Sequence, residues 1–141
     1  MKTICEKVEE LLEKPYRVID ILPERVPEEA PGGYFAVERY YLEPARYADI
    51  RKRFADIILK LYCYYDLSVL LGDADEPSVD PEPEQLENRI ESAKQHMCIL
   101  IGNDSLLMIS TDDLYMTVFN ADDSLMRRLE LLAKANGLFV R

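Results

Sequence analysis

The clearest evidence for the fold lies in residues Met97–Phe119, MCILIGNDSLLMISTDDLYMTVF. Two short polar turns, which begin at Gly102 and Ser110, separate three apolar runs: 97–101, 106–109 and 114–119. Short apolar runs divided by Gly, Asn, Ser and Asp are typical of strands that follow one another through tight turns. The stretch therefore predicts a three-stranded antiparallel meander. Because its runs are apolar on both faces, we expect the sheet to be covered at least partly on both sides.

Further strands are expected on either side of the meander from β-branched and aromatic composition, at 16–22, 34–42, 67–72 and 138–140. The segment 34–42, YFAVERYYL, is the most unusual of them. As a strand it places Glu38 on one face and Arg39 on the other, each among aromatic residues. If this strand is central, at least one of these charges is half-buried and needs a partner.

Four helices complete the predicted elements. A capping box, Thr3 with Glu6, starts the first helix, which ends before Pro15. Pro44 suits the first turn of the longest helix, whose apolar spacing continues to about Tyr65. The third and fourth helices are expected to begin at Asp80-Pro81 and at 120–123, and Asn136-Gly137 ends the last one.

These elements predict one α+β domain over residues 1–141, a size that buries a sizeable core without disulfides or metal. The expected architecture is a sandwich: a mixed sheet with the antiparallel meander at 97–119, packed by about four helices. Long loops are expected at 23–33 and 73–83, which hold three prolines each. Long ordered loops are often functional.

The net charge of −10 is concentrated in one segment, because residues 73–91 hold eight carboxylates and one arginine. This acidity argues against direct nucleic-acid binding and against anionic membrane surfaces, and a basic protein partner or self-association fits better. No apolar run approaches the length of a membrane span. Three cysteines without paired spacing, and early charge at the N-terminus, predict a cytoplasmic protein.

The first candidate site is a ligand pocket. Glu38 and Arg39 lie in a tyrosine-rich stretch. Tyr115 and Thr117 in the last strand of the meander belong to the same polar face if the strands are neighbours. A charged anchor among tyrosines suits a small polar ligand. The alternatives are an edge strand, or a structural pairing of the two charges with other residues.

The second candidate site is a metal site. Asp104 lies in the first turn of the meander, and Asp122 and Asp123 follow its last strand at the same end of the sheet. Three such carboxylates suit a hard cation. Turn formation and helix capping call for the same residue types, and remain the alternative. No cofactor is predicted, because the glycine patterns of nucleotide-binding loops are absent, and no catalytic residue is assigned.

Two segments carry a resemblance to known proteins. The first joins Asp20-Ile21-Leu22-Pro23 to Tyr34-Phe35-Ala36-Val37-Glu38-Arg39-Tyr40-Tyr41, and the second joins Asp113-Leu114-Tyr115-Met116-Thr117-Val118-Phe119-Asn120 to Gly137-Leu138-Phe139. They resemble a group of small, uncharacterised, cytoplasmic proteins of clostridial-type bacteria, over most of the chain except 73–91. The group has no assigned activity. The resemblance therefore implies a bacterial single-domain protein and carries over no catalytic residue.

Two functions follow as hypotheses. The first is a non-enzymatic binding or protein-interaction domain that acts through an acidic surface. The alternative is a small-ligand-binding domain or hydrolase with a tyrosine-lined pocket around Glu38 and Arg39. An interaction domain is expected to expose an apolar patch or to self-associate, whereas a ligand-binding domain is expected to hold Glu38 or Arg39 in a deep pocket.

Overall fold

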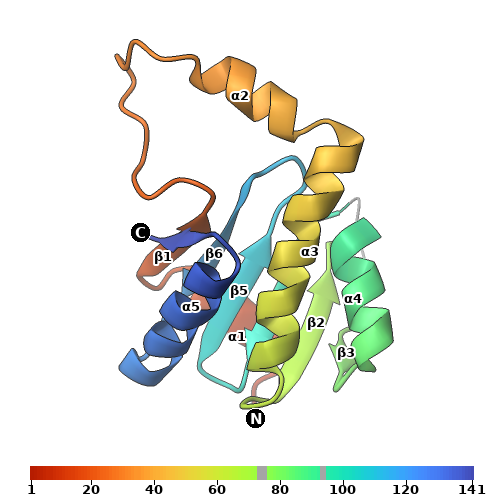
Figure 1. Ribbon diagram of the computed structural model, residues 1–141. Coiled ribbons are helices and arrows are strands. Elements are labelled where there is room, and N and C mark those ends of the chain that lie inside the picture. The colour runs from red at the N-terminus through yellow and green to blue at the C-terminus, as the bar shows by residue number, and fades with distance from the viewer. Residues whose placement is uncertain (73–75, 93–94) are drawn as a thin grey trace.

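The computed structural model describes residues 1–72, 76–92 and 95–141. Within these ranges the chain forms five helices and seven strands (Figure 1). The helices are α1 (Ile4–Leu11), α2 (Tyr34–Tyr41), α3 (Pro44–Leu61), α4 (Pro83–Ser92) and α5 (Asp123–Ala135). The strands are β1 (Tyr16–Asp20), β2 (Leu67–Leu71), β3 (Ser78–Val79), β4 (Met97–Ile101), β5 (Ser105–Ile109), β6 (Tyr115–Phe119) and β7 (Phe139–Val140).

All seven strands form one sheet in the order β3-β2-β4-β5-β6-β1-β7. The meander predicted at 97–119 is confirmed as β4, β5 and β6, with Leu106 opposite both Leu100 and Phe119. Gly102 turns β4 into β5 with a φ of 60°, a conformation that glycine adopts without steric cost. β1 lies between β6 and β7, so a strand from the start of the chain is enclosed by two from its end.

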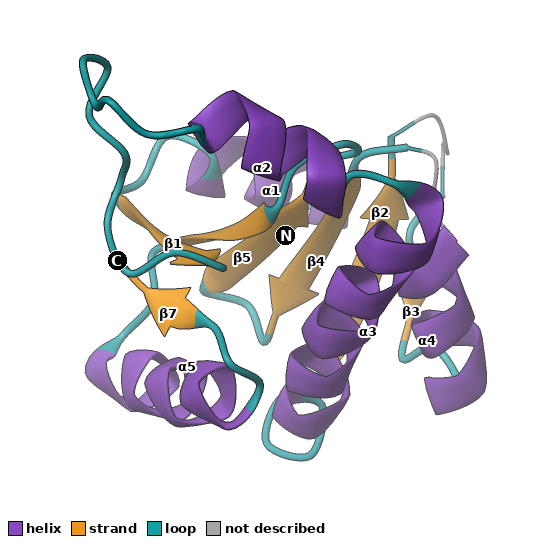
Figure 2. Ribbon diagram, turned by 45° about the horizontal axis from the view of Figure 1, so that its top comes forward, coloured by secondary structure: helices purple, strands orange, loops and turns teal. Residues whose placement is uncertain are grey.

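One face of the sheet carries α3, α4 and α5 (Figures 1 and 2). The main core lies between these helices and the sheet. Phe54 and Ile57 of α3 and Leu129 of α5 are fully buried there, as are Ile109 and Met116 of the sheet. The side chain of Asp122 starts α5 by accepting a hydrogen bond from the backbone N–H of Leu125 at 2.8 Å. The chain leaves α5 through Gly137, which has a φ of 71°.

The opposite face of the sheet is covered only in part. Here α1 packs Val8 and Leu11 against Leu100, Leu106 and Phe119. The expected capping box starts this helix: Thr3 Oγ1 accepts from the backbone N–H of Glu6 at 3.1 Å, and the Glu6 carboxylate accepts from the N–H of Thr3 at 3.4 Å. α1 lies over β4 and β5, which leaves part of this face, over β1 and β6, to be covered by other segments.

The predicted α+β class and single sheet with the meander are confirmed, but the sheet is not mixed. Each of its six neighbouring pairs is antiparallel. Strand direction across a helical connection depends on where the connection ends, and the sequence carries no local signal for this. None of the helices in the described ranges is both long and apolar enough to cross a bilayer.

The strand predicted at 34–42 is wrong, because this segment forms α2. It follows a long connection after β1 and is not part of the sheet, and its backbone groups pair within the segment instead. Helical bonds such as Leu42 N–H to Glu38 O at 3.0 Å do this. The Tyr34 hydroxyl also donates to Glu38 Oε2 at 3.0 Å across one helical turn. Glu38 and Arg39 therefore do not alternate across a sheet, and the chain has five described helices rather than four.

Three boundaries also differ from expectation. α3 ends at Leu61 instead of continuing to Tyr65. α4 begins at Pro83, because Asp80 adopts a φ of 47° and donates its backbone N–H to Leu67 O at 3.1 Å. The loop expected at 73–83 contains the short strand β3, and its residues 73–75 lie outside the described ranges. The loop at 23–33 is confirmed as a segment without helix or strand.

Candidate functional site

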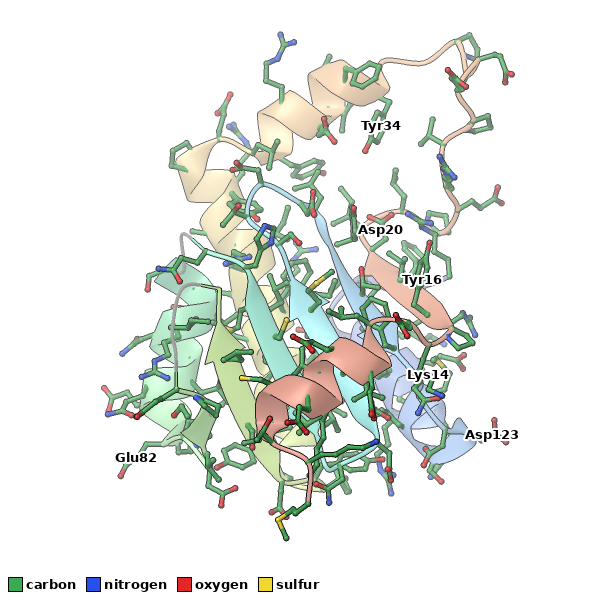
Figure 3. All side chains as sticks on the ribbon, turned by 180° about the vertical axis from the view of Figure 1, so that it is seen from behind. Lys14, Tyr16, Asp20, Tyr34, Glu82 and Asp123 are labelled. Atoms are coloured by element: carbon green, nitrogen blue, oxygen red, sulfur yellow. The ribbon has the colours of Figure 1, made fainter. Side chains whose placement is uncertain are left out.

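A cavity of about 930 Å³ lies on the face of the sheet that α1 leaves partly open. Its floor belongs to β1, β5 and β6, and residues 22–35 pass above it. We call residues 21–43, the loop and α2 together, the arch. In Figure 3, Tyr34 points from the arch toward Asp20 and Tyr16 on β1. The cavity is therefore bounded by a rigid sheet below and by an irregular segment above.

The floor is mainly apolar, with one polar group at its centre. The register of the sheet places Thr117 between Val18 and Met108, and all three line the cavity. Thr117 is only 8% exposed, and its hydroxyl forms no hydrogen bond with the residues that the structure describes. Buried hydroxyls usually have a partner, so this hydroxyl is available to a ligand in the cavity.

One wall of the cavity is an ion pair. Arg141 donates from Nε and Nη2 to Asp20 Oδ2, at 3.0 and 2.9 Å. The backbone N–H of Ile21 donates to the other carboxylate oxygen of Asp20 at 2.7 Å. Two backbone hydrogen bonds of 2.8 Å between Arg141 and Val18 hold this arginine beside β1. The Asp20 carboxylate thus compensates the charge of Arg141.

Burial, and then neighbouring carboxylates, raise the pKa of three groups at the rim near α2. Burial raises the pKa of Tyr34, and the Glu38 and Asp20 carboxylates raise it further. Burial and then Asp113 and Asp20 raise the pKa of Tyr115. The pKa of Asp113 itself is raised, first by burial, although His96 acts in the opposite direction, and Glu38 adds to the increase. Each acidic neighbour disfavours another negative charge, so this rim favours a cation.

The three residues predicted for a ligand pocket are only partly brought together. Tyr115 lines the cavity. Glu38 is half-buried on α2 and reaches the cavity through its hydrogen bond with Tyr34. Arg39 is exposed on α2 and does not contribute to the lining. Of the three residues, Tyr115 alone lines the cavity, and Glu38 contacts it through Tyr34.

The three predicted metal ligands have separate structural roles. Asp122 caps α5, and Asp123 lies in the first turn of that helix, where a negative charge is favourable. Asp104 contributes its backbone carbonyl, which accepts from the side-chain amide of Asn120 at 2.8 Å. Among the residues outside 73–75 and 93–94, no three histidine, cysteine, aspartate or glutamate side chains are arranged to hold a metal ion.

Sequence reasoning missed Asp20 and Arg141 as site residues. Asp20 follows Val18 and Ile19 directly, and a carboxylate next to apolar residues of a strand is the signal that could have identified it. Thr117 was expected on the same polar face as Tyr115, and both residues line the cavity. Arg141 carries no local signal, because only the pairing of β7 with β1 brings it to Asp20.

The helix of the arch exposes its apolar side chains. None of the eight residues of α2 is buried, although five of them are Tyr, Phe or Val. Phe35 is 74% exposed, Val37 49% and Tyr40 48%. Tyr34 and Phe35 also line the cavity, so the exposed helix and the cavity form one continuous surface. The Arg46 guanidinium lies 3.8 Å from the centre of the Tyr40 ring and covers part of it.

Comparisons of the chain with protein-family models, with curated proteins and with solved structures find no match.

Proposed function

We propose that this protein is a protein-interaction domain that binds its partner through the arch and the adjoining cavity. The observation that carries the proposal is the composition of α2. Isolated helices shorter than about 12–15 residues are marginal in water, and most helices are stabilised by packing an apolar face. α2 has eight residues and exposes Phe35, Val37 and Tyr40. A partner that packs on these side chains accounts for both the helix and its composition.

The surroundings of the arch support a partner with positive charge. The chain carries a net charge of −10, and the rim of the cavity holds Glu38 and Asp113. The acidic segment expected to bind a partner, 73–91, is described from residue 76 onward, and this part forms β3 and α4 away from the arch (Figure 1). The proposal therefore relies on the carboxylates near α2 and not on that segment.

A small-ligand-binding function is the second candidate, and the volume of the cavity favours it. Ligand pockets usually measure about 300–1,000 Å³ and combine apolar walls with a few polar groups. The cavity of about 930 Å³ lies in this range and is lined by both apolar and charged residues. The described lining offers a ligand several polar groups: the Thr117 hydroxyl, the Asp20–Arg141 pair and three tyrosine hydroxyls.

A capture experiment with matched variants tests the proposed interaction. The double variant Phe35→Ser/Val37→Ser removes the exposed apolar side chains of α2. The control is Leu131→Ser, since Leu131 is 60% exposed on α5. Proteins captured from the native host are quantified for wild type and both variants, and sedimentation measures self-association of each.

We expect the double variant to lose at least about tenfold in binding of one partner, because exposed aromatic anchors dominate interface energies. The control is expected to bind like wild type. Equal capture by wild type and the α2 double variant, together with unchanged sedimentation, contradicts the proposal.

A further inference from the structure

We infer that the cavity receives a basic side chain, Lys or Arg, from the partner polypeptide. This inference rests on the proposed function, since it assumes that the partner binds at the arch. It assigns to the cavity a chemical class of ligand, and to Thr117, Glu38 and Asp113 a part in binding it.

The floor of the cavity suits the aliphatic part of such a side chain. Lys and Arg bury their methylene stems against apolar surface while the charged group stays with polar partners. Val18, Met108 and Phe119 provide apolar surface in the floor. Thr117 lies between Val18 and Met108 and offers a hydroxyl oxygen that accepts no hydrogen bond from a described residue. An ammonium or guanidinium group supplies the donor that this oxygen lacks.

The charged groups around the cavity favour a cation over an anion. The lining and the rim near Tyr34 and Tyr115 hold five carboxylates against two guanidinium groups. One of those guanidinium groups, Arg141, already binds Asp20 through two nitrogen atoms. An anionic ligand would compete with Asp20 for Arg141 and would also face Glu38 and Asp113.

The tyrosines of the rim add a second preference for a cation. Tyr34 and Tyr115 both line the cavity, so two tyrosine rings lie at its rim. The face of a tyrosine ring attracts Lys and Arg, and more strongly when the pair is removed from water. The hydroxyl of Tyr34 is held by Glu38 at 3.0 Å, which places a carboxylate next to this ring.

The test uses blocked peptides as probes and NMR to locate where they bind. Acetylated, amidated pentapeptides Gly-Gly-X-Gly-Gly are titrated into the labelled protein at low salt, with X as Arg, Leu or Glu. N-acetylarginine amide serves as the free small cation. We expect the Arg peptide to shift backbone amide signals of Val18, Met108 and Thr117 at concentrations up to about 5 mM. The Leu and Glu peptides are expected to leave these signals unchanged.

Variants of equal net charge separate the cavity from the general acidity of the protein. The double variant Glu38→Gln/Asp113→Asn removes two carboxylates at the rim. The control, Glu82→Gln/Glu87→Gln, removes two exposed carboxylates at α4, and Figure 3 shows Glu82 far from Tyr34 and Asp20. We expect the rim variant to weaken binding of the Arg peptide about tenfold, and the α4 variant by less than about twofold.

Thr117→Val provides an independent variant, because valine keeps the shape and strand preference of threonine and removes the hydroxyl. We expect it to weaken binding about tenfold, as for loss of a hydrogen bond to a charged group.

Three results overturn the inference. They are equal loss of binding in the two charge variants, binding of the Glu peptide in the cavity, and no binding of the Arg peptide at the highest concentration. Equal affinity for N-acetylarginine amide and the Arg peptide overturns the polypeptide source. The proposed interaction survives each of these results, since it is tested by the apolar variants of α2.

Discussion

The exposure of α2 leads to a prediction about stability that compares two phenylalanines. Phe35 on α2 is 74% exposed, whereas Phe54 on α3 is 0% exposed. Fully burying a phenylalanine removes about 200 Å² from water, which contributes about 5 kcal/mol at roughly 25 cal/mol per Å². Phe35 buries about a quarter of its surface, so its contribution is at most about 1 kcal/mol.

The perturbation is the pair of substitutions Phe35→Ala and Phe54→Ala, each measured by urea unfolding. We expect Phe54→Ala to lower the free energy of unfolding by about 3–5 kcal/mol, because it also leaves a cavity in the core. Phe35→Ala is expected to lower it by about 1 kcal/mol or less. With a denaturant slope of about 2 kcal/mol per M, the urea midpoint should fall by about 2 M for Phe54→Ala. It should fall by less than about 0.5 M for Phe35→Ala.

A loss of about 3 kcal/mol for Phe35→Ala would refute the reasoning. It would mean that α2 packs its apolar side chains within the folded protein or on a second copy. Repeating the measurement over a wide range of protein concentration separates these cases, because only self-association makes stability depend on concentration.

Three further predictions concern polar groups. Asp122→Ala should cost about 1 kcal/mol in urea unfolding, because it removes the cap of α5, while Asp104→Ala should cost less than about 0.5 kcal/mol. A rise in melting temperature on adding Ca²⁺ or Mg²⁺, absent in these variants, would restore the metal hypothesis. Because burial raises the pKa of Asp113 in the folded state, its protonation favours folding at low pH, and this contribution is lost as pH rises through the folded pKa. Relative to wild type, Asp113→Asn should therefore change the free energy of unfolding more favourably at pH 7 than near pH 3. An equal change at both pH values would be inconsistent with this. Arg141→Met should cost about 2–3 kcal/mol, less than a fully buried pair, because the Arg141 side chain is 26% exposed and that of Asp20 10%. A double-mutant cycle of Arg141→Met with Asp20→Asn should show a coupling energy above about 1 kcal/mol. Additive effects on the free energy of unfolding would contradict a stabilising ion pair.

The sequence was sufficient to predict the meander because the signals for it are local. The runs at 97–101 and 106–109 are short, apolar and separated by a turn at Gly102, which adopts the positive φ that such turns require. The cap of α1 at Thr3 and the end of α5 at Gly137 are local in the same sense. Each of these features depends on residues within a few positions of one another.

The helix α2 was not predicted, because the aromatic and β-branched composition of 34–42 favours a strand. Two helical signals were present. Tyr34, Val37 and Tyr41 lie at the i, i+3, i+7 spacing of one helical face. Tyr34 and Glu38 have the spacing at which side chains interact across one helical turn.

The cavity was not predictable because it depends on the order of strands. Val18, Thr117 and Met108 become neighbours only when β1 pairs with β6 and β6 with β5. Asp20 meets Arg141 only through the pairing of β1 with β7. No local pattern in the sequence indicates these long-range pairings, although the individual strands can be recognised.

The position of β1 between β6 and β7 has a consequence for folding during synthesis. β1 is made early, but about a hundred residues separate it from its partner β6. At roughly 5–20 residues per second, β1 waits about 5–20 s before that partner emerges, and its apolar residues Val18 and Ile19 stay unpaired for that time. Contacts between such distant segments also slow folding after synthesis. The floor of the cavity is therefore among the last parts of the protein to form.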